Sequence, residues 1–410
     1  MRHRCVMPVA AAGLLGLATP VSAQCMYEVT IVAGPPCGDD HRNITFYGIN
    51  DLGDACGYVC GSCITCFTLD PIAWSGRTGL VFLEAAPGDE TPRANDLNVH
   101  GDIVGTMEYP DTPDVGRMAT LWRDGAAIPL VLPEGATLSE GNAINNAGVV
   151  AGAVDFEEGP WQATLWVDGQ IVNIGPDIPT LKSFAFDINE HNVVVGRTSE
   201  NSTLSFRGFV WHAGRAIILP PVTDVGNSEA FAVNDRGHVA GHGNIRDLFS
   251  RRVGFVWRDG EMTILDDLPS QDDIEVKDIN DAGQIVGQAE GANAAFLWQD
   301  GEIIDLNDRI TPVPGLDIHL RHAWAINDRG QIAGYGTVFP PGAPGYQAGY
   351  ILTPIDSGPA DLNIDCRVDA ADLMIMLQDW GDSQHLPSDI DGDGIVGPRD
   401  LAALLADWRP

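Results

Sequence analysis

Residues 279–301 read Ile-Asn-Asp-Ala-Gly-Gln-Ile-Val-Gly-Gln-Ala-Glu-Gly-Ala-Asn-Ala-Ala-Phe-Leu-Trp-Gln-Asp-Gly, and they contain the unit from which most of this chain is built. The unit opens with the anchor Asn280, a turn glycine, Gly283, and a short apolar segment. Its second half, residues 295–298, runs into Asp300-Gly301. Asp-Gly is a hairpin signal, because both positions accept a positive φ. The unit therefore predicts strand–turn–strand, a connection, and a second strand–turn–strand.

The unit recurs seven times between residues 46 and 352, at steps of 44 to 48 residues. A fixed period of this size indicates a repeat architecture. The anchor asparagines are Asn50, Asn98, Asn145, Asn189, Asn234, Asn280 and Asn327, and the tryptophans of the second halves are Trp74, Trp122, Trp166, Trp211, Trp257 and Trp298. Four antiparallel strands in each of seven units predict an all-β, seven-bladed β-propeller over residues 24–355, with an open solenoid as the alternative.

The two ends of the repeat array complement each other. The seventh unit stops near residues 351–353 and lacks its fourth strand. Ahead of the first unit, residues 27–32 resemble residues 261–265, which form a fourth strand in the fifth unit. We expect the N-terminal strand to complete the last blade, because this would leave no exposed strand edge.

The repeat resembles the bacterial extracellular HAF repeat family, whose consensus joins an A-x-x-IN-x-x-G-x-VVG half to an HAFLW-x-DG half. Residues 295–301 are the closest match, with Ala294 in the place of the histidine. The resemblance covers about three quarters of the chain. It implies an extracellular β-propeller and no particular chemistry, and a propeller fold does not by itself decide function.

The last fifty residues carry a different repeat. Oxygen-bearing side chains occupy positions 1, 3, 5, 9 and 12 of a loop that begins at Asp361, and the pattern returns 28 residues later at Asp389. This is the ligand spacing of a 12-residue Ca²⁺ loop, whereas an acidic surface loop is the alternative. We predict two calcium sites. The expected ligands are Asp361, Asn363, Asp365, Arg367 (through its carbonyl), Asp369 (through water) and Asp372, then Asp389, Asp391, Asp393, Ile395 (through its carbonyl) and Asp400.

The two loops differ at position 6, where the chain turns sharply. The second loop has Gly394 there and the first has Cys366, so we expect the first site to be the weaker one. Each loop precedes a short apolar helix, and we expect these helices to bury Leu373, Leu377, Leu401 and Leu405.

This duplicated loop–helix pattern, over residues 361–408, resembles a type I dockerin. The resemblance implies an EF-hand-type, calcium-folded module that docks secreted, often polysaccharide-degrading, proteins to a partner. The pairs at loop positions 10 and 11, Ala370-Ala371 and Pro398-Arg399, depart from the Ser-Thr-like pair that cohesin partners read. The partners left open are an extracellular protein, with a cohesin among the options, or a glycan. Residues 356–360 form a short breaker segment, so we expect the module at residues 361–410 to behave independently of the propeller.

The N-terminus has the pattern of an export signal. Arg2 and Arg4 precede an apolar stretch at residues 8–17, and residues 21–23 form a small-residue cleavage site. No other apolar run approaches the roughly 20 residues of a membrane helix. We therefore expect a signal peptide at residues 1–23 and a secreted or cell-surface protein. The net charge of −34 disfavours nucleic acid and anionic membranes as partners.

Seven cysteines follow the predicted signal peptide. An oxidising compartment favours disulfides among the first six, whereas the spacing of the last four of these six also fits a metal or iron–sulfur cluster. Cys366 remains unpaired by this count. The first six are Cys25, Cys37, Cys56, Cys60, Cys63 and Cys66.

Common catalytic motifs are missing: there is no GxSxG, HExxH, phosphate loop or GxGxxG. We interpret His238 and His242 as surface histidines rather than a metal site. We interpret the recurring asparagines and tryptophans as turn and core residues. The connections between second and third strands vary most, and in a propeller they share one face, where binding usually occurs. We expect a secreted, non-enzymatic binding or scaffold protein. The alternative is a carbohydrate-active hydrolase or lyase in polysaccharide degradation, which clustered acidic and aromatic residues in a central pocket would favour.

Overall fold

The structure is a computed structural model that describes most of the chain. The described residues are 25–37, 40–60, 67–109, 116–156, 159–178, 182–199, 206–224, 226–245, 251–265, 273–299, 301–355, 358–381 and 387–408. The predicted signal peptide, Cys63, Cys66 and parts of most second-to-third-strand connections lie outside them.

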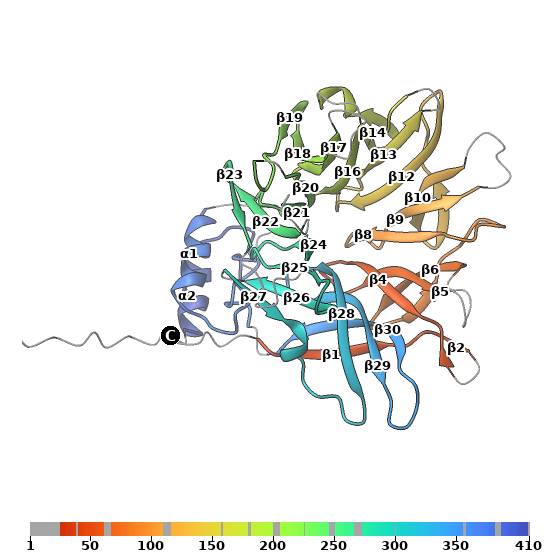
Figure 1. The fold of residues 1–410 in the computed structure, drawn as a ribbon. Coiled ribbons are helices and arrows are strands. Elements are labelled where there is room, and N and C mark those ends of the chain that lie inside the picture. The colour runs from red at the N-terminus through yellow and green to blue at the C-terminus, as the bar shows by residue number, and fades with distance from the viewer. Residues whose placement is uncertain are drawn as a thin grey trace, which may run out of the picture.

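Seven four-stranded antiparallel sheets are arranged around a common axis (Figure 1). The first strands of neighbouring sheets pack against each other all the way round, including β28 of the last blade against β4 of the first. The predicted seven-bladed propeller is therefore confirmed, and the open solenoid is wrong.

The blades follow the chain in order. They are β4 (Ile44–Ile49), β5 (Ala55–Cys60), β6 (Leu69–Ser75) and β7 (Gly79–Phe82); β8 (Arg93–Leu97), β9 (Ile103–Glu108), β10 (Arg117–Arg123) and β11 (Ala126–Pro129); β12 (Ala136–Ile144), β13 (Val150–Phe156), β14 (Gln162–Val167) and β15 (Gln170–Asn173); β16 (Lys182–Ile188), β17 (Val194–Ser199), β18 (Phe206–His212) and β19 (Arg215–Ile218); β20 (Glu229–Val233), β21 (Val239–Asn244), β22 (Arg252–Arg258) and β23 (Glu261–Ile264); β24 (Ile274–Ile279), β25 (Ile285–Ala289), β26 (Ala294–Gln299) and β27 (Glu302–Asp305); and β28 (Asp317–Ile326), β29 (Ile332–Phe339) and β30 (Tyr346–Pro354). Smaller elements are β2 (Pro36–Cys37), β3 (Asp40–His41), and the 3₁₀ turns at Gly175–Asp177 and Leu306–Asp308.

The N-terminal strand closes the ring. β1 (Tyr27–Val32) pairs antiparallel with β30, from Tyr27 opposite Pro354 to Val32 opposite Gly349. It supplies the fourth strand that the seventh blade lacks, as expected from the sequence. Tyr27 is 1% exposed and belongs to the core of the last two blades.

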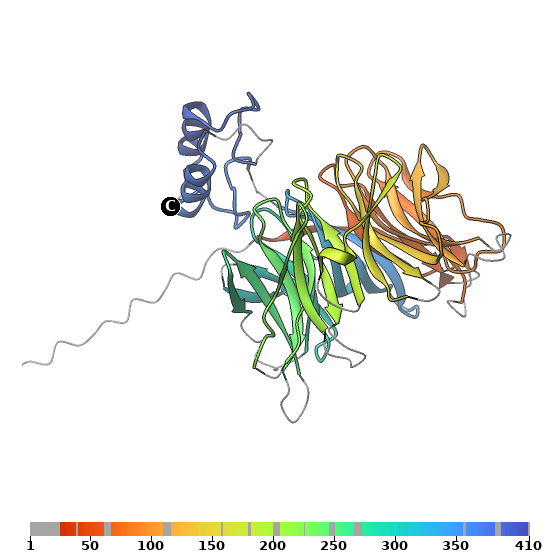
Figure 2. The same cartoon turned by 90° about the horizontal axis from the view of Figure 1, so that it is seen from above.

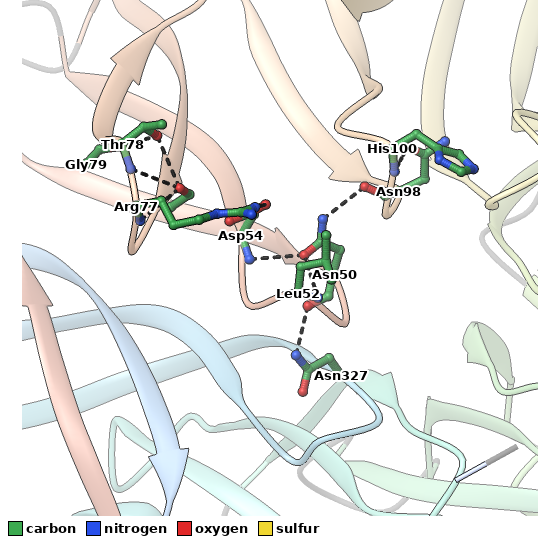
Figure 3. A network of polar contacts seen from close by, with 10 residues as sticks. Asn50, Leu52, Asp54, Arg77, Thr78, Gly79, Asn98, His100 and Asn327 are labelled. Carbon is green, nitrogen blue, oxygen red and sulfur yellow. Dashed lines mark hydrogen bonds and ion pairs between the residues drawn. The ribbon is translucent and has the colours of Figure 1, made fainter. Parts of the chain in front are cut away.

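The anchor asparagines join each blade to the next. The Nδ2 of Asn50 donates to the carbonyl oxygen of Asn98 at 2.9 Å, and its Oδ1 accepts from the N–H groups of Leu52 and Asp54 in its own turn. The same Asn-to-Asn bond recurs in every blade, and the bond from Asn327 to Asn50 completes the circle at 2.8 Å (Figure 3). The turn role predicted for these residues is confirmed.

The repeated tryptophans serve the core. Trp122 and Trp166 are 1% and 2% exposed, and their indole N–H groups donate to the carbonyls of Glu84 and Val131 in the preceding blades. These two tryptophans therefore fill the space between blades with their polar atoms paired, as predicted for core residues, whereas the indole N–H of the buried Trp298 has no partner among the described residues.

The C-terminal module contains the helices α1 (Ala370–Gln378) and α2 (Pro398–Ala406), which stand off one side of the propeller (Figure 2). Met376 and Leu404 are fully buried between them. Leu377 and Leu405, which we expected to be buried, are 54% and 52% exposed. In each helix the buried residue is the one directly before the predicted leucine. A shift of one residue rotates a side chain by about 100° around the helix axis, which is enough to move it from the buried to the exposed side. None of the described helices is long and apolar enough to cross a membrane.

The cysteine pairing differs from the prediction. Cys366 is not unpaired: it forms a disulfide with Cys25, 341 residues away. Cys60 is also disulfide-bonded, whereas Cys56 is a free thiol. Cys56 faces the core between the first two blades, where burial raises its pKa well above the usual value.

The module is fastened to the propeller, contrary to the predicted independence. Besides the disulfide, the guanidinium of Arg236 pairs with both carboxylate oxygens of Asp379 at 3.0 and 3.2 Å. Gln299 donates its Nε2 to the carbonyl oxygen of Asn363 at 3.0 Å, and Ile364 inserts into the core of the last two blades.

Candidate functional site: two cavities at opposite ends of the central channel

A β-bulge interrupts the first strand of every blade. In blade one Phe46 pairs with Gly57 and Gly48 with Cys56, which leaves Tyr47 unpaired between them. The extra residue always lies three positions before the anchor asparagine. Around the ring these residues are Tyr47, Asn95, Asn142, Phe186, Phe231, Lys277 and Trp324. Bulges re-aim side chains, and here they build a ring from all seven blades.

The ring lines a cavity of about 350 Å³, here called the loop-end cavity. Thr91, Arg93, Thr106, Arg117 and Glu140 complete its lining. The first strand of each blade begins beside the second-to-third-strand connection and ends at the anchor asparagine. The bulge residues precede the anchor asparagines, so they lie toward the end of the channel where these connections are. The cavity therefore opens on the face at which the sequence analysis placed binding.

Ring contacts fix the walls of the loop-end cavity. Tyr47 meets Trp324 edge-on with centroids 4.7 Å apart, and Phe186 stacks on Phe231 at 5.1 Å. The ammonium of Lys277 lies 4.3 Å from the centroid of Trp324, a cation–π distance. These contacts hold the side chains in place before any ligand arrives.

Several ionisable groups in and around the loop-end cavity are perturbed. Burial raises the pKa of Glu140, partly offset by Arg117 and Arg197. Burial also opposes ionisation of Glu275, but Lys277 and Arg252 outweigh it and lower its pKa to about 2. Burial lowers the pKa of His322 to about 4, so its imidazole is neutral at pH 7.

The two histidines singled out in the sequence have different environments. His242 is 6% exposed, not a surface residue: it stacks on Phe231 with centroids 4.3 Å apart, and its Nδ1 accepts from the N–H of Val276. Burial lowers its pKa to about 3. His238 is half-buried, and neither histidine belongs to a metal-ligating cluster within the described part of the chain.

A second cavity, the turn-end cavity, occupies the other end of the channel with a volume of about 440 Å³. Among the described residues, its lining contains the carboxylates of Asp51, Glu190, Asp235, Asp281 and Asp328, and no lysine or arginine. These carboxylates accept hydrogen bonds that link neighbouring blades. The N–H of Asp281 donates to the carboxylate of Asp328 at 2.8 Å, and the N–H of Asp328 donates to that of Asp51 at 3.0 Å. Their repetition is therefore structural.

Three further aspartates belong to blades two, four and six, and those of blades four and six also line the turn-end cavity. Each accepts one N–H from its own strand and one from the next blade; Asp187, for example, accepts from Ile188 and Val233, both at 2.8 Å. The others are Asp96 and Asp278. Burial raises the pKa of Asp96 to about 7 and that of Asp187 to about 6.

This burial gives a pH-dependent prediction for Asp187. Its folded pKa of about 6 exceeds the unfolded value of roughly 3.9, so the folded state binds the proton more tightly. The wild type therefore gains stability relative to Asp187→Ala as pH falls below about 6. The destabilisation caused by Asp187→Ala should grow by about 1–1.5 kcal/mol between pH 8 and pH 5. Urea unfolding measures it, with the exposed Glu261→Ala as control; a pH-independent difference would contradict this.

The predicted calcium ligands of the second loop lie close together. Oxygens of Asp389, Asp391 and Asp393 are within 4.8 Å of one another, and one oxygen of Asp389 is buried without a hydrogen-bond partner. Asp400 accepts from the N–H groups of Asp391 and Gly397. Ile395 follows at the next carbonyl position of the loop. An unpaired buried oxygen among three carboxylates fits a hard cation.

The first loop is more closed. Asp361 accepts from the N–H groups of Asp365 and Cys366, and Asp372 from those of Leu362, Asn363 and Asp369. Cys366 has φ 66° where Gly394 of the second loop has φ 89°. The loop therefore keeps the expected turn, but its position-6 residue forms the disulfide. Asp369 caps α1 through Ala371, and no metal-type cluster of three carboxylates forms among the described residues of this loop.

The bulge ring was missed in the sequence analysis, although a signal exists. The residue three positions before each anchor asparagine changes from amide to aromatic to cation, whereas the residue directly before the asparagine is always Ile, Leu or Val. A variable position within a constant framework is the pattern that a ligand-facing residue produces.

One protein family and several solved structures are similar to this chain. Residues 157–360 match a family described as "Protein of unknown function (DUF3466)". No curated protein matches the chain. Among solved structures, a streptogramin B lyase is 13% identical (81% of this chain, 99% of that chain, TM-score 0.48) and virginiamycin B lyase from Staphylococcus aureus is 10% identical (80% and 100%, TM-score 0.48). The propeller domain of the Trilobed protease from Pyrococcus furiosus is 9% identical (80% and 94%, TM-score 0.46). These similarities concern the fold alone.

Proposed function

We propose that this chain is a secreted, non-enzymatic binding protein: the propeller binds a ligand in the loop-end cavity, and the C-terminal module docks or anchors it through calcium. The observation that carries the first half is the ring of seven bulge residues. Seven equivalent positions on a rigid framework carry five different residue types and converge on one cavity. A framework that keeps its anchors constant while this ring varies is typical of a binding site.

The placement of the module is compatible with simultaneous binding. Its contacts with the propeller involve the turn after Asn234, through Arg236, and Gln284 in the turn after Asn280. These turns are at the opposite end of the first strands from the loop-end cavity. A ligand in the cavity and a partner on the module would therefore not compete for the same surface.

The module offers a docking face of its own. Met374, Leu377 and Leu405 are 61%, 54% and 52% exposed on α1 and α2. Large apolar side chains exposed on two short helices are a feature of interaction surfaces. This supports the dockerin-like interpretation, with an extracellular protein as the expected partner of this face.

Calcium binding can be tested on the full-length protein. We expect calorimetry to give two sites in the wild type and one in each of Asp389→Ala and Asp361→Ala. Asp389→Ala should remove the tighter site, because Asp389 lies in the loop that keeps Gly394 and a clustered carboxylate set. Asp407→Ala, exposed and outside both loops, is the matched control. Two unchanged sites in Asp389→Ala, or no calcium binding by the wild type, would contradict the calcium-module proposal.

A carbohydrate-active hydrolase or lyase is the second candidate, and Glu140 favours it. Its carboxyl group lines the loop-end cavity beside aromatic rings, and burial raises its pKa toward that of a general acid. By the criterion set from the sequence, acidic and aromatic residues clustered in a central pocket favour this candidate.

A glycan array probed with the mature protein, followed by a product assay on each hit, separates the two candidates. We expect glycan binding without turnover. Turnover that Glu140→Gln abolishes, with binding retained, would establish the enzyme instead. No binding to any glycan would contradict a glycan ligand for either candidate.

A further inference from the structure

We infer that the loop-end cavity takes an acidic saccharide, a sugar that carries both hydroxyl groups and a carboxylate, with Arg93 and Lys277 as its anion-binding residues. This inference rests on the proposed function, which makes the cavity a ligand site, and it specifies the chemical class of the ligand.

The charge of the cavity is opposite to that of the chain. The protein has 57 acidic and 23 basic residues, yet the cavity lining holds three cations, Arg93, Arg117 and Lys277, and one carboxylate, Glu140. The turn-end cavity of the same channel has no lysine or arginine in its lining, as far as the structure describes the chain. An anion is therefore attracted to one end of the channel and repelled from the other.

The cavity lining holds more hydrogen-bond donors than the described protein groups that accept from them. The exposed guanidinium of Arg93 forms no hydrogen bond or ion pair with any described residue. Lys277 pairs with Glu275 at 3.2 Å, but Glu275 also pairs with Arg252. Arg117 has a partner in Glu108, at 3.5 Å. The indole N–H of Trp324 is buried without a partner. The unpaired guanidinium of Arg93 suits a carboxylate, which a guanidinium can bind through two parallel hydrogen bonds, and Lys277 shares its one carboxylate partner with Arg252.

Arg93 and Lys277 approach the cavity from different sides. Arg93 belongs to blade two and Lys277 to blade six, with three blades between them in one direction and two in the other. A ligand that contacts both must therefore extend across the channel, which favours an oligosaccharide over a small inorganic anion.

The cavity also holds acceptors that require a ligand with hydroxyl groups. Asn95 and Asn142 each donate their Nδ2 to a carbonyl of the next blade at 2.8 Å, which fixes their orientation. Neither amide oxygen accepts a hydrogen bond from a described residue, and both residues line the cavity. With the carboxylate of Glu140 they can accept hydrogen bonds from sugar hydroxyls, which an anion without hydroxyl groups cannot donate. The Phe186–Phe231 pair adds apolar surface to the lining of the cavity, beside which a sugar ring can pack.

Calorimetry on the mature protein tests this inference with four probes: trigalacturonate and trimannuronate, and the neutral galactotriose and mannotriose. We expect at least one acidic trisaccharide to bind at least about tenfold more tightly than its neutral counterpart. Arg93→Gln and Lys277→Gln should each weaken that binding about tenfold. Arg215→Gln, on the exposed outer strand β19, should leave it unchanged. A melting temperature within a few degrees of the wild type establishes that each variant is folded.

The contradicting outcomes are distinct. Equal binding of neutral and acidic trisaccharides, abolished by Phe231→Leu, would overturn the acidic specificity and leave the cavity as a ligand site. Binding that neither Phe231→Leu nor Lys277→Gln alters would overturn both the inference and the proposed function. Absence of binding by all four probes would overturn the inference, while the glycan array decides the proposed function separately.

Discussion

Deletion of residues 24–35 is expected to abolish the cooperative thermal unfolding transition of the propeller. The deletion removes β1, which pairs with residues 349–354 of β30, and exposes the backbone of β30 there. It also removes the buried Tyr27 and the Cys25–Cys366 disulfide. Loss of a buried large side chain and of a disulfide together costs roughly 5–10 kcal/mol, comparable with the whole stability of a typical protein.

Circular dichroism during heating measures this effect, and two variants separate its causes. Cys25→Ser removes only the disulfide and should lower the melting temperature while the transition stays cooperative. Thr30→Ala changes an exposed residue of β1 and should have little effect. An unchanged melting temperature after the deletion would show that β1 does not close the ring.

Asn98→Ala is expected to destabilise the propeller by about 3 kcal/mol, although the asparagine fills no part of the hydrophobic core. Its Nδ2 donates to the carbonyl of Asn145, and its Oδ1 accepts from the N–H groups of His100 and Asp102. The substitution leaves two backbone donors without their partner, and each such loss costs about 1–3 kcal/mol.

Asn98→Asp separates the two roles of the residue. It keeps the acceptor for the turn and loses the donor to the next blade, so we expect an intermediate loss of stability in urea unfolding. The exposed His100→Ala is the control from the same turn. A change below about 0.5 kcal/mol for Asn98→Ala would mean that the asparagine circle does not hold the blades together.

The features that the sequence predicted correctly are those that repeat locally. The anchor asparagine, its turn glycine and the tryptophan strand lie within about 25 residues of each other, so their spacing defines a blade without knowledge of the rest. Closure by residues 27–32 was also predictable, because seven copies with one missing strand leave a single place for an unassigned strand.

The incorrect predictions concern contacts between distant segments. Cys25 and Cys366 are 341 residues apart, and only the packing of the module on the last blades brings them together. Cysteine spacing contains no information about such packing. The choice between Leu377 and Met376 as the buried residue of α1 likewise depends on the angle at which the two helices meet, which an apolar run does not specify.

The candidate site was predictable only in part. The sequence indicated the face of the propeller on which the loop-end cavity opens, because variable connections mark that face. It did not indicate the bulges, since one extra residue in a strand is recognised only when the partner strand is known. Lys277 and Trp324 therefore looked like ordinary strand residues until their pairing placed them in the channel.

The most direct test of the binding-site assignment compares two sets of substitutions on the same glycan array. One set, Phe231→Leu with Trp324→Leu, alters the loop-end cavity, and the other, Glu190→Gln with Asp235→Asn, alters the turn-end cavity. We expect the first set to eliminate every glycan signal of the wild type while the protein stays folded, and the second to retain the signals. Retained binding in the first set, or binding lost only in the second, would show that the ring of bulge residues is not the binding site.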